Sequence, residues 1–88
     1  MLPDVVRLAG GPDAIAKLAA QKNQAGQHVE ALHLTEIALA AEAAHRPSLE
    51  TRLDALQKLH ARSVNSNERG WLSYHIRLVQ KSLGLAER

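Results

Sequence analysis

The sequence of 88 residues contains no cysteine and no phenylalanine. It has one tryptophan, Trp71, and one tyrosine, Tyr74. Without cysteine, neither disulfide bonds nor thiolate metal sites can supplement the hydrophobic core. With so few aromatic rings, the core must come from leucine, isoleucine, valine and many alanines. Such small and aliphatic side chains suit closely packed helices better than sheets. The composition therefore predicts an all-α fold.

Long apolar runs are also missing. No run approaches the roughly 20 residues that a helix needs to span a bilayer, and the N-terminus lacks the basic-then-apolar pattern of a secretory signal. A chain of this length forms one domain and buries only about 60–65% of its unfolded surface. We therefore expect residues 1–88 to form a single helical association domain that is cytoplasmic and has no membrane partner.

Apolar periodicity, prolines and glycines divide the chain into an array of about five helices. The predicted helices cover residues 3–9, 12–25, 27–43, 47–62 and 67–83. Gly10-Gly11 followed by Pro12 is typical of one helix ending and the next beginning. Gly26 is expected to end the second helix, and Asn65 with Glu68 forms a plausible capping pair for the last.

The helix predicted over residues 27–43 has apolar residues on two sides, with Leu34 and Ala38 on one and Leu32 and Leu39 on the other. A helix that is apolar on two sides is covered on two sides, so we place it at the centre of the domain. The short connection before it forces an antiparallel pair. Small residues at the crossing points make this pair similar to a tetratricopeptide-like helical hairpin.

The last predicted helix carries a narrow apolar seam whose members step by four, three and four residues: Leu72, Ile76, Val79 and Leu83. Such a seam packs against a helix of the same chain or of a second copy. Trp71 stands beside it, and buried aromatic residues dominate interface energetics. We predict these five residues as an association surface, with closure of the chain's own core as the alternative.

No group of residues has the pattern of a catalytic or metal site. His28 and His33 are five residues apart and so diverge by about 140° around a helix, which prevents them from sharing a metal. Glu30 and His33 form one Glu-x-x-His step, whereas di-iron bundles need two. No serine follows the strand-to-helix elbow of a hydrolase nucleophile. We expect no catalytic, cofactor-binding or metal-binding residues, and no enzyme activity from this chain alone.

Short motifs follow one another along nearly the whole chain. They are Leu8-Ala9-Gly10-Gly11-Pro12-Asp13, the Ala25-Gly26-Gln27 turn with Glu30-Ala31 after it, Pro47, and an asparagine/serine turn before the Trp71 helix. In this order they resemble the alkyl-sulfatase dimerisation domain. The resemblance implies a tetratricopeptide-like module that follows the zinc-dependent metallo-β-lactamase-fold domain of alkyl sulfatases and related hydrolases and drives homodimer formation. It also implies that zinc and the hydrolytic chemistry belong to that preceding domain.

Two dipeptides, Glu36-Ile37 and Leu72-Ser73, differ from those usual in alkyl sulfatases, so a less specialised hydrolase of the same fold fits equally well as the parent. We therefore expect a non-catalytic dimerisation or docking module, whose partner is a second copy or a hydrolase domain. The alternative is a small helical adaptor that binds a peptide, or with less support nucleic acid, through a groove or its basic C-terminal half. Residues 46–88 carry eight basic and four acidic side chains, but two aromatic residues offer little surface for base stacking.

Overall fold

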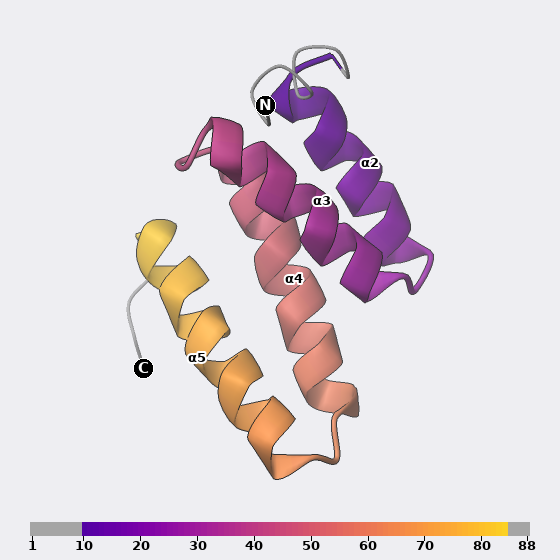
Figure 1. Ribbon diagram of the computed structural model, residues 1–88, viewed down its shortest axis with the longest axis vertical. Coiled ribbons are helices and arrows are strands. Elements are labelled where there is room, and N and C mark those ends of the chain that lie inside the picture. The colour runs from indigo at the N-terminus through magenta and orange to yellow at the C-terminus, as the bar shows by residue number, and fades with distance from the viewer. Residues whose placement is uncertain (1–9, 85–88) are drawn as a thin grey trace.

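The computed structural model describes residues 10–84, which form four α-helices and no strand (Figure 1). The helices are α2 (Pro12–Gln24), α3 (His28–Ala41), α4 (Arg46–Arg62) and α5 (Ser66–Ser82). The all-α prediction is confirmed, and each of these helices begins and ends within two residues of its predicted bounds. The predicted helix over residues 3–9 lies outside the described residues. Within residues 10–84, no helix is both long and apolar enough to cross a membrane.

The helix ends follow the local sequence signals. Helix α2 begins at Pro12 directly after Gly11, whose φ is 91°, and the turn after it contains Gly26 with φ 86°. Glycine adopts this left-handed backbone without the steric cost that a Cβ atom adds. At the start of α5, the side chain of Asn65 accepts a hydrogen bond from the backbone N–H of Glu68 at 3.0 Å. The predicted N-cap is therefore present.

Successive helices run in opposite directions, with α2 and α5 at the two edges of the view and α4 between them (Figure 1). Each helix packs against the next, and α2 also packs against α4. Helix α4 therefore contacts all three other helices, and the prediction that residues 27–43 form the centre is wrong. The reason is a second buried face on α4, where the fully buried Ser48 and Ala55 lie seven residues apart and so on one side. Counting leucines alone misses this face because its residues are small.

The core has two parts. The larger joins Leu49 and Leu56 of α4 to Leu72 and Val79 of α5, with Leu83 just after it. The smaller joins Ile15 of α2 to Ala38 of α3. Partly buried residues of α3 pack against both parts: Leu32 and Leu39 against the first, Leu34 and Ile37 against the second. The prediction that this helix is covered on two sides is confirmed.

A polar network ties α2, α3 and α4 together. The side-chain amide of Asn23 donates to Asp54, and its oxygen accepts from Nδ1 of His28. Lys58 donates to the same Asp54 oxygen at 2.9 Å. This hydrogen bond from Lys58 lowers the pKa of the Asp54 carboxyl, an effect that burial opposes and Asn23 reinforces. The stabilisation is present above the ordinary aspartate pKa of about 3.9 and is lost as the pH falls through the lowered value.

Replacing Gly70 tests whether α5 tolerates a better helix former. Gly70 lies in the helix, and a Cβ atom added there meets no neighbouring atom within 4 Å. We expect Gly70→Ala to raise the free energy of unfolding by about 0.5–1 kcal/mol, measured by urea denaturation. Gly26→Ala is the matched control, because its φ of 86° strains any L side chain. That variant should lose about 1–2 kcal/mol, and a stabilised Gly26→Ala would contradict the turn geometry.

Candidate functional site: a groove between α3 and α5

Helices α3 and α5 both pack on α4 but remain apart from each other. No Cα atom of α3 lies within 8 Å of a Cα atom of α5. The space between them is a hollow of about 590 Å³, which we call the α3/α5 groove. Its apolar lining comes from all three helices: Val29 and Leu32 of α3, Leu59 of α4, and Trp71 and Leu72 of α5. This volume falls within the range of about 300–1,000 Å³ that is usual for binding pockets.

The α3/α5 groove also contains charged and titratable side chains. Arg52 comes from α4, which lies between the two flanking helices, so its side chain lies at the floor. Burial lowers the pKa of the Arg52 guanidinium, while the nearby Glu36 carboxylate raises it. Arg52 donates a long hydrogen bond of 3.4 Å to the backbone oxygen of Leu32. Among residues 10–84, it has no carboxylate within 4 Å.

One wall of the groove is an aromatic stack on α5. The ring centroids of Trp71 and His75 are 4.1 Å apart with the planes tilted by 40°. Tyr74 contacts His75 edge-on, at 5.4 Å between centroids. Burial lowers the pKa of His75, and the positive charge of Arg52 lowers it further. Both effects favour the neutral form of the imidazole next to the indole.

A second hollow of about 230 Å³ lies next to the first. Leu39 of α3, Ala43 just after α3 and Leu78 of α5 line it, and it shares Arg52 and His75 with the larger hollow. The two hollows therefore lie side by side, and Arg52 and His75 lie between them.

The structure places most of the predicted association surface inside the chain. Leu72, Val79 and Leu83 are only 2%, 5% and 9% exposed and pack against α4, and Ile76 is half-buried against the same cluster. Trp71, in contrast, is 52% exposed. Of the five predicted residues, only Trp71 and Leu72 line the α3/α5 groove, and only Trp71 has a large exposed surface there.

Sequence reasoning did not single out Val29, Arg52 or His75 as site residues. A signal for Arg52 was nevertheless present in the sequence. Arg52 lies three residues after Leu49 and four before Leu56, so it interrupts the leucine stripe of α4. A charged residue at such a position indicates that part of the stripe faces a polar or open region.

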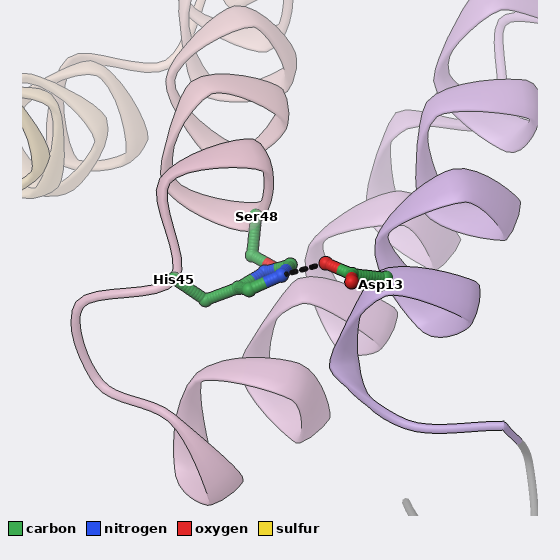
Figure 2. A network of polar contacts seen from close by, with 3 residues as sticks. All are labelled: Asp13, His45 and Ser48. Carbon is green, nitrogen blue, oxygen red and sulfur yellow. Dashed lines mark hydrogen bonds and ion pairs between the residues drawn. The ribbon is translucent and has the colours of Figure 1, made fainter.

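A serine, a histidine and an aspartate meet between α2 and the start of α4 (Figure 2). The Oγ atom of Ser48 is 2.7 Å from Nδ1 of His45, and Nε2 of the same ring hydrogen-bonds to Asp13. Hydrolase triads use the opposite ring nitrogens and expose the serine to substrate. Here Ser48 is fully buried, so no substrate reaches its hydroxyl. The network instead ties the N-terminal ends of α2 and α4 together.

The other histidines are also separate. His28 is buried against Asn23, whereas His33 is exposed and lines the α3/α5 groove, so the prediction that they diverge is confirmed. Nε2 of His60 lies 3.0 Å from Oγ of Ser73 and links α4 to α5. In the part of the chain that the structure describes, no three His, Asp or Glu side chains gather as a metal site requires.

Comparison with known proteins adds no relative. No family model matches the chain, and no curated protein or solved structure is significantly similar to it.

Removing His45 tests the buried network. His45→Ala leaves the buried Ser48 hydroxyl without its partner, and we expect a loss of about 1–3 kcal/mol in the free energy of unfolding, measured in urea. The matched control is Asp13→Asn, because the side chain of Asp13 is 91% exposed and water screens its contact with His45. Equal losses of stability in the two variants would contradict the assignment of the stabilisation to the buried contact between His45 and Ser48.

The stack of Trp71 on His75 gives a pH-dependent signal. Trp71 is the chain's one tryptophan, and a protonated imidazole in contact with indole quenches its fluorescence. Because the pKa of His75 is lowered, we expect emission to fall on acidification with a midpoint below the ordinary histidine value of about 6.5. The folded chain binds this proton more weakly than the unfolded chain, so stability decreases as the pH falls from about 6.5 toward the lowered pKa.

Two variants check the origin of this signal. His75→Gln should abolish the transition, and Arg52→Gln should raise its midpoint by removing the neighbouring charge. A midpoint at or above 6.5 in the unsubstituted protein would show that the imidazole is not desolvated in this stack.

Proposed function

We propose that this chain is a non-catalytic subunit-association module whose α3/α5 groove receives part of a second subunit. The observation that carries the proposal is the half-exposed Trp71 at the edge of an apolar groove. Tryptophan is among the residues most enriched at the energetic centres of protein interfaces. A lone chain that leaves it uncovered exposes apolar area that a partner would remove from water.

Further exposed apolar side chains flank the same groove. Val29 of α3 and Trp71 and Leu78 of α5 are each between 42% and 56% exposed. Val29 and Trp71 line the larger hollow, and Leu78 lines the smaller one. Exposed apolar residues that lie together around a groove are typical of interaction sites.

The arrangement of the helices supports a tetratricopeptide-like module. In such arrays, each repeat is a helical hairpin and the first helices of successive hairpins pack together. Here α2–α3 and α4–α5 are two successive hairpins, and α2 packs against α4. This pattern supports the resemblance to the helical dimerisation domain of alkyl sulfatases and related hydrolases. In that reading, zinc and catalysis belong to a parent hydrolase domain.

Pairing would also stabilise the folded state of a domain of this size. A single small core supplies only a few kcal/mol, and association stabilises the folded state by mass action. Specific interfaces cover about 800 Å² on each partner. We propose a homodimer as the functional form, with docking onto a hydrolase domain as the other association mode.

A peptide-binding adaptor is the second candidate. The observation in its favour is that a second hollow lies next to the α3/α5 groove and shares Arg52 and His75 with it. An extended or helical peptide with apolar anchors fits such a groove. This candidate requires the free protein to be a monomer.

Light-scattering mass across a hundredfold range of protein concentration tests the proposal. We expect the mass to rise from 9.6 kDa toward twice that value with concentration. Trp71→Ala should weaken association about 30-fold, which corresponds to the roughly 2 kcal/mol that an interface hot spot contributes. The matched control is Leu18→Ala, an exposed apolar residue of α2 outside the groove, which should leave the dissociation constant unchanged. A strict monomer at every concentration would exclude the homodimer.

A further inference from the structure

The floor of the α3/α5 groove holds a cation without a matching anion. Arg52 makes one long hydrogen bond, to a backbone oxygen, and no ion pair within 4 Å among the described residues. A guanidinium has five N–H donors, so most donors of Arg52 have no hydrogen-bond partner among residues 10–84. Arg46 and Lys58 of the same helix differ, since Arg46 pairs with Glu50 at 3.4 Å and Lys58 with Asp54 at 2.9 Å.

Partial burial makes this missing partner important. Desolvation lowers the pKa of Arg52, which shows that the groove disfavours its charge. Glu36 acts in the other direction but lies too far away to form an ion pair. A desolvated guanidinium gains most from a carboxylate that approaches it face to face and accepts two hydrogen bonds. The chemistry of the floor thus favours a carboxylate that residues 10–84 do not supply.

The rim of the groove offers such a carboxylate. Glu68 of α5 lines the groove, is exposed, and has no lysine or arginine within 4 Å in the described part of the chain. Glu68 and Trp71 are three residues apart on one helix and so lie on the same side, one turn apart. The rim therefore presents an aromatic anchor and an acid together.

We propose that the groove is occupied by the α5 edge of a second copy, with Glu68 of each copy paired to Arg52 of the other and Trp71 inserted between them. This inference rests on the proposed homodimer and specifies its contacts. A two-fold dimer uses the same surface on both subunits, so that surface must carry both halves of every contact. The α3/α5 groove does so, because it holds at its floor a cation, and at its rim an acid beside an aromatic residue, that have no ion pair among residues 10–84.

Charge exchange between the two positions tests the pairing. Arg52→Glu places like charges opposite each other in its own dimer, and Glu68→Arg does the same with the opposite sign. Each variant alone should dimerise about tenfold or more weakly than the unsubstituted chain. In an equimolar mixture, each altered position of one variant faces the opposite charge on the other. The mixture should therefore form heterodimers, seen by native mass spectrometry with a mass tag on one variant.

Matched controls come from exposed charges outside both hollows. Glu30→Arg on α3 and Arg77→Glu on α5 reverse the same types of charge without lining the groove. Neither variant should weaken the homodimer by more than about twofold, because exposed charges at a distance are screened. Mixing these two variants should give no preference for heterodimers.

If Arg52→Glu fails to fold, as judged by its helical circular dichroism, a double-mutant cycle with neutral substitutions tests the pairing instead. Arg52→Gln and Glu68→Gln should each weaken the dimer, and the double variant should lose less than the sum of the two losses. Additive losses would overturn the pairing.

The remaining outcomes separate this inference from the proposed function. A homodimer that Trp71→Ala weakens but that charge exchange does not restore would overturn the Glu68–Arg52 pairing and keep the association module. A monomer at every concentration would overturn both the pairing and the homodimer. Dimers that form in the mixture of the two variants, but not in either variant by itself, would support both the pairing and the homodimer.

Discussion

Helix α4 packs through two different faces, and the positions of the other helices depend on this difference. One face carries the small residues Ser48 and Ala55, both fully buried. Ser48 contacts His45, which in turn hydrogen-bonds to Asp13 of α2. The other face carries Leu49 and Leu56, which pack against α5. Small residues let helix backbones approach closely, whereas leucines hold them further apart. Since α3 and α5 both rest on α4 without approaching each other, the groove between them is a direct result of this packing.

The groove combines exposed apolar area with a partly desolvated charge, and each would be unfavourable to a chain that remained alone. Trp71 is half-exposed, and Arg52 lacks a carboxylate partner in the described chain. Both costs fall when a partner supplies apolar contacts and an acid in the same place. The proposed association site would account for these two features together, whereas closure of the chain's own core accounts for neither.

Three histidines connect neighbouring helices through hydrogen bonds. His28 joins α3 to α2 through Asn23, and His45 joins the start of α4 to α2 through Asp13. His60 joins α4 to α5 through Ser73. An imidazole can hydrogen-bond through both ring nitrogens, so it satisfies polar groups on neighbouring helices. In a chain without cysteine and with few aromatic residues, such connections supplement the apolar core.

What the sequence by itself determined is the local structure. Pro12 and Asn65 mark helix starts and Gly26 marks a turn, because capping and backbone conformation depend on neighbouring residues. Only the tertiary structure decided that α4 is central and that Leu72, Val79 and Leu83 face the chain's own core. The seam of α5 has the same periodicity whether it packs on its own chain or on another copy. The physical reason is that periodicity defines which side of a helix is apolar, whereas the partner of that side depends on how closely distant helices can approach.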